Sequence, residues 1–274
     1  MMGTFVEVVS PDESASGIVF DEISRIEGLL SKYKAESEVS RLNNEGRLRV
    51  SPETLYILAK SKEFWYLSEG AFDVTVGPLA DIWGFNEKKF RVPTESEIKS
   101  TLKYVGMDKI DLNNSDNVVK FKIPGIKIDL GAIAKGYALD CSINKLKEKG
   151  VKDCLINAGG QIYCLGKKGD TPWKVAVRRP RSNALSDKLR LENKSIATSG
   201  DYEQFFIKEG KRYSHILNPK TGYPADSGIL SVTVISTEAT TADALATAVF
   251  VLGKEKGLRL AKKFPGTKVE IIGR

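Results

Sequence analysis

The two residues with the clearest chemical potential are Asp243 and Thr247, in the segment 240–247. They are four residues apart, which on a helix places both side chains on one face, one turn apart. A carboxylate and a hydroxyl at this spacing, completed by backbone carbonyls, suit a hard cation such as Mg²⁺. Alternatively, Asp243 stabilises the start of a helix through its macrodipole, and Thr247 packs.

A second segment, residues 128–136, places Asp129 at the end of an expected strand and Lys135 in the first turns of an expected helix. The free N–H groups at a helix start bind phosphate, and Lys135 would add a positive charge there. An ordinary strand-to-helix turn, with Asp129 near the cap, explains the same residues. The two readings stay open on chemistry alone.

Three further segments concentrate small and polar residues, at positions 70–78, 157–160 and 213–224. The Gly159-Gly160 pair allows close approach of the backbone to a ligand, or simply forms a tight turn. The last segment holds His215, the only histidine, on an expected strand over 213–217 that ends in a Pro/Gly turn. A lone histidine is more often structural, but its usual pKa near 6.5 makes it the natural proton carrier if a site lies there.

The elements that must position these residues follow from hydrophobic periodicity and turn signals. We expect helices over 17–33, 51–68, 94–102, 134–149, 241–252 and 255–264. We expect strands over 4–9, 154–157, 161–165, 173–178, 205–208, 230–236 and 269–272, and a hairpin of 118–122 with 126–130 around Pro124-Gly125. Strands and helices without regular alternation predict an α+β fold with mixed or antiparallel sheets.

Composition excludes several classes of protein. The 274 residues are 41% hydrophobic and 28% charged, as in ordinary globular proteins, and three cysteines are too few for a disulfide framework. One histidine excludes the common His-rich zinc sites. Because no linker divides the chain, we expect a single domain over 1–274. The common nucleotide-binding glycine motifs are absent, and nothing supports nucleic-acid binding.

The chain begins MMGTFVEVV, without the features of a signal peptide. We therefore expect a cytoplasmic protein, or a periplasmic or inner-membrane-anchored one if a leading segment has been removed. Membrane association would then require a segment absent from this sequence.

Taken together, these segments resemble the ApbE-type FAD:protein FMN transferase family. The resemblance runs over nearly the whole length and is carried by an ordered series of blocks. They are Met2-Gly3-Thr4, Ser31-x-Tyr33, SEVSRLN from Ser37, GAFDVTVGPL from Gly70, DLGAIAKGYALD from Asp129, NAGG from Asn157, SGDYEQFF from Ser199, SHILNPKTGYP from Ser214 and TTADALATAVFVLG from Thr240.

The resemblance implies a single α+β unit with a cleft that binds FAD and Mg²⁺. The implied reaction transfers FMN from FAD to a Thr or Ser hydroxyl of a target protein through a phosphoester, and AMP is released. The implied targets are flavoprotein subunits of NADH:quinone reductase and Rnf-type electron-transport complexes. The alternatives are a Mg²⁺-dependent FAD pyrophosphatase that forms FMN and AMP, and a non-catalytic FAD-binding protein.

The resemblance also implies roles for individual residues. Metal ligands would be the backbone carbonyls of Ala132 and Ala246 with the side chains of Asp243 and Thr247. Contacts to FAD would come from Met2, Tyr33, Ala71, Phe72, Asp73, Asp129, Lys135 and Leu217. His215 would act as the catalytic base, with Asp243 as the catalytic metal ligand. Two positions depart from the family pattern: Asn218 replaces an Asp, and Gln161 replaces a common acid after Gly160.

Overall fold

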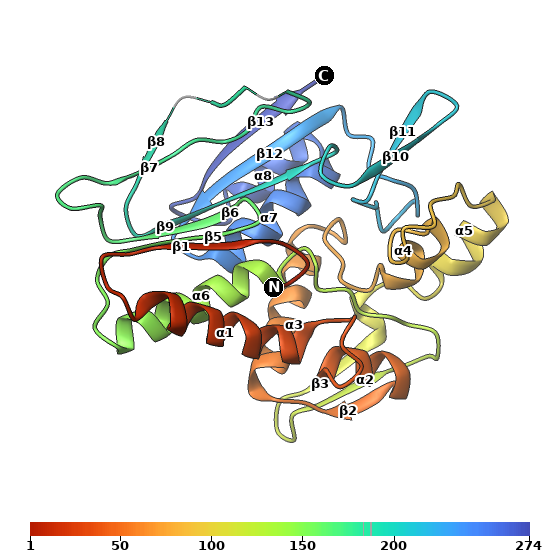
Figure 1. Cartoon of the computed structure of the whole chain (residues 1–274). Helices are drawn as coiled ribbons and strands as arrows, with labels where there is room; N and C mark the ends of the chain where they lie inside the picture. The colour runs from red at the N-terminus through yellow and green to blue at the C-terminus, as the bar shows by residue number, and fades with distance from the viewer. Residues whose placement is uncertain (183, 187) are drawn as a thin grey trace.

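A six-stranded antiparallel sheet forms the centre of the protein in the computed structural model, which describes residues 1–182, 184–186 and 188–274 (Figure 1). The strand order is β1-β5-β6-β9-β12-β13, with every neighbouring pair antiparallel. The strands are β1 (Val6–Val9), β5 (Cys154–Ala158), β6 (Gln161–Leu165), β9 (Lys194–Gly200), β12 (Ile229–Ser236) and β13 (Lys268–Gly273).

The two faces of this sheet are covered differently. Four helices pack on one face: α1 (Ala15–Leu30), α6 (Ala134–Glu148), α7 (Ala239–Leu252) and α8 (Lys254–Ala261). Part of the other face is covered by the hairpin of β7 (Trp173–Val175) and β8 (Leu189–Leu191), where Trp173 and Leu191 pack on Cys164 and Ile196. Alternate residues of β6 and β9 therefore enter two separate apolar layers, as the period of a strand requires.

Helices α6 and α7 hold each other at their N-terminal ends. Asp140 of α6 accepts hydrogen bonds from the backbone N–H groups of Ala239 and Thr240, both at 2.8 Å. In return, Asp243 of α7 accepts from the N–H of Gly136 at 3.0 Å. The helices approach so closely that a Cβ at Gly136 would lie 2.3 Å from the carbonyl oxygen of Ala239. Each helix start is thus capped by the other helix, which satisfies donors that a helix leaves free.

A second region is inserted between α1 and α6. It contains a three-stranded sheet in the order β2-β4-β3, and several helices around it (Figure 1). Its elements are α2 (Glu38–Glu45), β2 (Arg47–Arg49), α3 (Pro52–Leu67), α4 (Gly77–Trp83), α5 (Glu95–Leu102), the 3₁₀ helix η1 (Met107–Lys109), β3 (Ile110–Asn113) and β4 (Val118–Phe121). Ile57 and Val119 from this region share one buried cluster with Val232 and Val249. The predicted α+β single compact unit is confirmed.

A small aromatic cluster connects this region to the hairpin of β10 (Phe205–Lys208) and β11 (Lys211–Ser214). Phe206 stacks on Tyr213 with ring centroids 5.1 Å apart, and Trp83 at the end of α4 lies 5.5 Å from Tyr213. The indole N–H of Trp83 donates to the carbonyl of Gly222 at 2.8 Å. These contacts fix the base of a hairpin that has no other strand partners among the described residues.

Most predicted elements are present, but the hairpin expected around Pro124-Gly125 is wrong. Strand β4 pairs instead with β2 and β3, and the turn before it lies at 114–117. Residues 126–130 form no strand, because their backbone bonds go elsewhere: Ile128 bonds through both its N–H and its C=O to the side chain of Asn43, at 2.7 and 2.9 Å, and the N–H of Asp129 donates to Val74. The strand expected over 213–217 also ends earlier, at Ser214, so His215 lies just beyond it.

Within the part of the chain that is described, no helix combines the length and the apolar character needed to cross a bilayer.

Candidate active site

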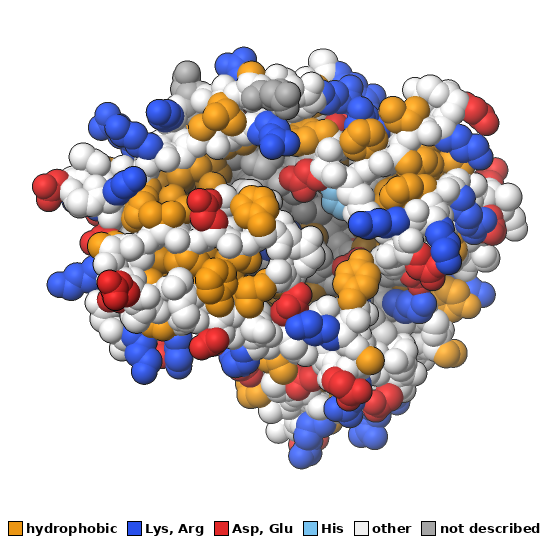
Figure 2. Space-filling view, viewed as in Figure 1, with side chains coloured by type: hydrophobic (Ala, Val, Ile, Leu, Met, Phe, Trp, Pro, Cys, Tyr) orange, Lys and Arg blue, Asp and Glu red, His pale blue; other side chains and the backbone are white. Residues whose placement is uncertain are grey.

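A pocket of about 270 Å³ lies where the six-stranded sheet, the second region and the β10–β11 hairpin meet. Figure 2 shows the hollow, with the imidazole of His215 at its edge. Eleven of the predicted site residues line this pocket, although they come from five separate parts of the sequence. They are Tyr33, Ala71, Phe72, Asp73, Asp129, Ala132, Lys135, His215, Leu217, Asp243 and Thr247.

Two predicted residues do not line the pocket. Ala246 is fully buried within α7. Met2 packs against the main core, and its backbone N–H donates to Glu27 at 2.6 Å. The neighbouring Thr4 does approach the pocket wall, because a Cβ on the lining residue Gly159 would meet the Thr4 hydroxyl oxygen at 2.3 Å. The roles of Met2 and Ala246 stay predictions.

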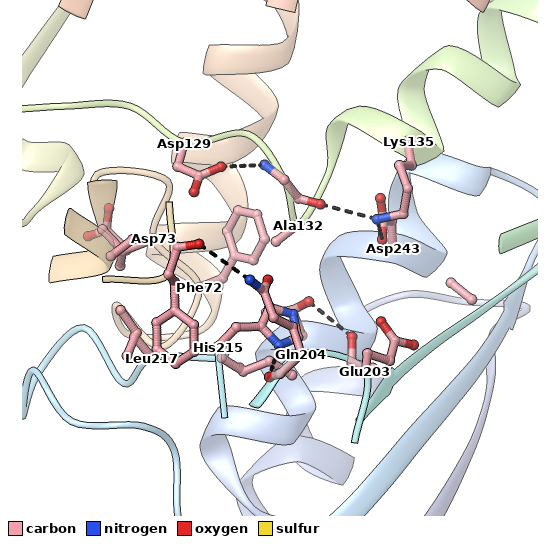
Figure 3. Close-up of a pocket in the computed structure, with 18 of the residues that line it drawn as sticks. Phe72, Asp73, Asp129, Ala132, Lys135, Glu203, Gln204, His215, Leu217 and Asp243 are labelled. Carbon is pink, nitrogen blue, oxygen red and sulfur yellow. Dashed lines mark hydrogen bonds and ion pairs between the residues drawn. The ribbon is translucent and has the colours of Figure 1, made fainter. Parts of the chain in front are cut away.

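Asp243 and Thr247 form one wall of the pocket with the start of α6. Oδ1 of Asp243 faces the ammonium of Lys135 at 3.8 Å, and Lys135 also donates to the carbonyl of Gly131 at 3.2 Å (Figure 3). The Thr247 hydroxyl is 3.1 Å from that of Ser199 on β9. Burial raises the pKa of Asp243, against the positive charge of Lys135 and the hydrogen bond from Gly136, which lower it. We call this wall, formed by Ala132, Lys135, Ser199, Asp243 and Thr247, the cation wall.

Asp129 and Lys32 form an ion pair at the side of the pocket, with Lys32 Nζ 2.6 Å from Asp129 Oδ2. Lys32 also donates to the side chain of Asn86, and its ammonium lies 5.0 Å from the centre of the Tyr33 ring. Burial alone would lower the pKa of Lys32, but the Asp129 carboxylate outweighs it and the pKa is raised. A charged ammonium therefore stands beside a largely exposed aromatic ring, a suitable edge for a polar aromatic ligand.

The loop before α4 brings Phe72 and Asp73 to the pocket floor. Asp73 Oδ1 accepts hydrogen bonds from the N–H and the hydroxyl of Thr75, at 2.8 and 2.5 Å, and the Thr75 hydroxyl oxygen accepts from the N–H of Gly106. Burial raises the pKa of Asp73 to about 6, although the bonds from Thr75 oppose the shift. This network holds the loop in one conformation, with Phe72 fully buried beneath the pocket.

The orientation of His215 leaves one ring nitrogen without a hydrogen-bond partner among the described residues. Its Nδ1 lies 3.0 Å from the carbonyl oxygen of Gln204, which also accepts the His215 backbone N–H (Figure 3). A carbonyl only accepts, so Nδ1 must carry the proton, and Nε2 keeps its lone pair in the neutral ring. Burial lowers the pKa of His215, with the nearby charge of Lys135 adding to the effect. The ring is therefore neutral at pH 7 and can accept a proton at Nε2.

Several lining residues lie outside the predicted site set, among them Lys32, Glu203 and Gln204. Lys32 is the unspecified position between Ser31 and Tyr33, and the other two lie inside the block from Ser199, so the blocks contained them without indicating their roles. Desolvation raises the pKa of Glu203, and the carboxylate of Asp243 raises it further while Lys135 lowers it.

The charges of the lining residues are unfavourable for an anion. Four carboxylates face two ammonium groups, which leaves a formal net charge of −2 (Asp73, Asp129, Glu203 and Asp243 against Lys32 and Lys135). No group of three or more His, Cys, Asp and Glu side chains converges within the described residues. A cation here would thus be held by one carboxylate and neutral oxygens, with the rest from its anionic ligand, and the Asp243–Thr247 donor set fits a hard cation of this kind.

The fold and pocket together define an α+β protein with a carboxylate-lined ligand pocket. The chain matches the model of the ApbE family over residues 2–271, and it belongs to that family. A FAD:protein FMN transferase of Haemophilus influenzae is 35% identical over 246 residues, covering 85% of this chain and 71% of that protein. One from Vibrio cholerae is 35% identical over 248 residues, covering 88% and 74%.

Solved structures agree with this assignment. The ApbE protein of Thermotoga maritima superposes with a TM-score of 0.91 at 37% identity, covering 99% of this chain and 92% of that one. The flavin transferase ApbE of Vibrio cholerae superposes with a TM-score of 0.88 at 30% identity, covering 100% and 91%.

Proposed function

We propose that this protein transfers FMN from FAD to a Thr or Ser hydroxyl of a target protein, with Mg²⁺ as cofactor. The observation that supports it most is the meeting of three groups in one pocket: the Asp243–Thr247 oxygen pair, the Lys135 ammonium and the free Nε2 of His215. The named relatives transfer FMN from FAD to protein, and the pocket contains groups suited to that reaction.

In the proposed reaction, the acceptor hydroxyl forms a bond to the phosphorus of the FMN phosphate, and the pyrophosphate P–O bond breaks. The acceptor proton passes to Nε2 of His215, and AMP leaves with the bond's electron pair. Phe72, Leu217 and Tyr33 would contact the flavin end of FAD, while Lys135 and the start of α6 would face the phosphates. Positioning and charge stabilisation supply most of the catalysis in phosphoryl transfer.

A divalent cation held by Asp243 and Thr247, with the carbonyls of Ala132 and Ala246, would offset the negative charge of the pyrophosphate. The formal net charge of −2, with every lining carboxylate ionised, supports this part of the proposal, because a pocket of that charge without a cation would repel FAD. That the acceptors are subunits of NADH:quinone reductase or Rnf-type complexes rests on the family resemblance alone.

The test is incubation with FAD and Mg²⁺, with and without an acceptor domain of the proposed class. We expect the acceptor to gain the mass of FMN less one water, with one AMP released for each flavin attached. Free FMN and AMP beside an unchanged acceptor would indicate a FAD pyrophosphatase instead. Intact FAD after hours with Mg²⁺ would indicate a flavin carrier, and either result would overturn the proposal.

A further inference from the structure

One buried oxygen of the pocket has no hydrogen-bond partner among the described residues. Four buried side-chain atoms of the described residues lack a hydrogen bond: Gln161 Oε1, Asp201 Oδ1, Arg212 Nη1 and Ser214 Oγ. Only Gln161 lines the pocket. An unpaired buried acceptor costs about 1–3 kcal/mol, so a ligand that supplies a donor or a positive charge would recover this free energy.

The orientation of the Gln161 amide is determined by its other contact. Its Nε2 donates to the carbonyl oxygen of Ala239 at 3.0 Å. Because that carbonyl can only accept, the NH₂ group must face it, and Oε1 must be the free atom. The side chain is only 3% exposed, so bulk water does not satisfy this oxygen.

Gln161 lies beside the cation wall, next to the proposed cation ligands. Its partner Ala239 is the first residue of α7, and Asp243 follows four residues later, which is about 6 Å along the axis. Ser199, whose hydroxyl pairs with that of Thr247, lies on β9, the strand next to β6 where Gln161 begins. Gln161 is therefore next to the cation wall, and both line the same pocket.

We propose that Gln161 Oε1 is a further ligand of the divalent cation, bound to it directly or through a cation-bound water. The proposal rests on the Mg²⁺ dependence in the proposed function. It gives Gln161 a specific effect on the site: its neutral amide leaves Asp243 as the only carboxylate of the cation wall. Position 161 then controls how strongly the protein itself attracts the cation before FAD supplies phosphate charge.

The test uses Mn²⁺ alone, without FAD, and measures bound metal by electron paramagnetic resonance. Gln161→Glu places a second carboxylate at the cation and should tighten Mn²⁺ binding at least about tenfold, since opposite charges in a partly buried site attract strongly. Gln161→Met, similar in length but without the oxygen, should weaken binding several-fold. A purely structural role predicts that both variants lose the bond to Ala239 and that neither binds Mn²⁺ more tightly.

Gln204→Glu is the matched control. Gln204 lines the same pocket, and its Nε2 also donates to a backbone carbonyl, that of Phe85 at 3.3 Å, but it lies beside His215 rather than at the cation wall. The Gln204→Glu variant adds the same charge as Gln161→Glu and also loses a hydrogen bond to a backbone carbonyl. Because it lies away from the cation wall, it should tighten Mn²⁺ binding much less than Gln161→Glu. If Gln161→Glu destabilises the fold, the rise in melting temperature on adding Mn²⁺ should still exceed that of the wild type.

The outcomes separate this inference from the proposed function. If the wild type binds Mn²⁺ and Asp243→Asn abolishes the binding, but Gln161→Glu binds no more tightly than the wild type or only as tightly as Gln204→Glu, the inference alone is wrong. If Asp243→Asn leaves Mn²⁺ binding unchanged, the metal site of the proposed function is wrong as well.

Discussion

The two sides of the pocket are built in contrasting ways. The cation wall comes from α6 and α7, whose starts are capped by each other's aspartates and whose residues belong to the main core. The opposite side, with Gln204, His215 and Leu217, is held by a two-stranded hairpin and a small aromatic cluster around Trp83. We infer that the two sides have different functions: the first side binds the phosphates and the cation, and the second receives the acceptor hydroxyl.

The largest effect should come from Asp243→Asn. The amide oxygen can still accept the N–H of Gly136, so α6 keeps its cap while the negative charge is lost. We expect AMP release from FAD to fall by at least about 10³-fold, as the loss of several kcal/mol of charge stabilisation implies. Glu203→Gln removes a carboxylate from the same pocket and should cost far less. Equal losses in the two variants would mean that overall charge, not the cation wall, matters.

His215→Asn should distinguish the functions of the two sides of the pocket. We expect the rate of flavin transfer to fall by about 10²–10⁴-fold, the usual contribution of a general base, while affinity for FAD and for Mn²⁺ stays near that of the wild type. A rate within a few-fold of the wild type would mean that His215 has only a structural role. A loss of Mn²⁺ affinity as large as the loss of rate would contradict the separate functions of the two sides.

The pH dependence of flavin transfer also tests the role of His215 as the base. Burial lowers the pKa of His215 below its ordinary value, so the neutral base persists to lower pH than in a free histidine. The transfer rate should therefore stay constant down to about pH 6.5 and fall only below it. His215→Asn should lack this acidic limb in a rate profile measured at saturating FAD and Mg²⁺. A midpoint above the ordinary histidine value would show that the ring is stabilised in its charged form.

Gly136→Ala tests the helix contact that supports the cation wall. The added Cβ would meet the carbonyl of Ala239 at 2.3 Å and push the two helices apart. Overpacking of this kind costs about 1–3 kcal/mol, so we expect the melting temperature to fall by several degrees and Mn²⁺ affinity to weaken. Gly28→Ala, on α1 with open space around it, is the control and should be neutral or slightly stabilising. Unchanged Mn²⁺ affinity in Gly136→Ala would show that the wall does not depend on this contact.

Deleting residues 1–4 should have the smallest effect. Met2 does not line the pocket, but Thr4 packs against Gly159, which does. We expect FAD to bind a few-fold more weakly in a fluorescence titration, with Mn²⁺ affinity unchanged. If FAD affinity is unaffected, the N-terminus has no part in the site.

The comparison of the two sides also explains what the sequence could predict. Helix α7 was predicted nearly in full, because its apolar run is a local signal. The chemistry of Asp243 was predictable as a helix spacing, but its cap on Gly136, 107 residues away, is tertiary. On the other side, His215 was identified by being the only histidine, whereas the tautomer that frees Nε2 depends on the Gln204 carbonyl across the hairpin.

The wrong and missed predictions have a similar cause. Residues 126–130 have the composition of a strand, but the side chain of Asn43 takes the bonds that a hairpin partner would have made. Helices α2 and α4 were missed because they are short, with 8 and 7 residues, and strand β9 because its sequence KSIATSG is largely polar. Lys32 was missed because its partner Asp129 is 97 residues away.

The most direct test of the proposed cation site is the position of the bound metal ion. Crystals of the protein grown with Mn²⁺ and FAD, measured at the manganese absorption edge, would locate the metal by its anomalous signal. We expect a peak within coordination distance of Asp243 Oδ1 and the Thr247 hydroxyl, with Gln161 Oε1 facing the ion or its water. A peak beside Asp73 or Asp129 instead, with none at Asp243, would contradict it.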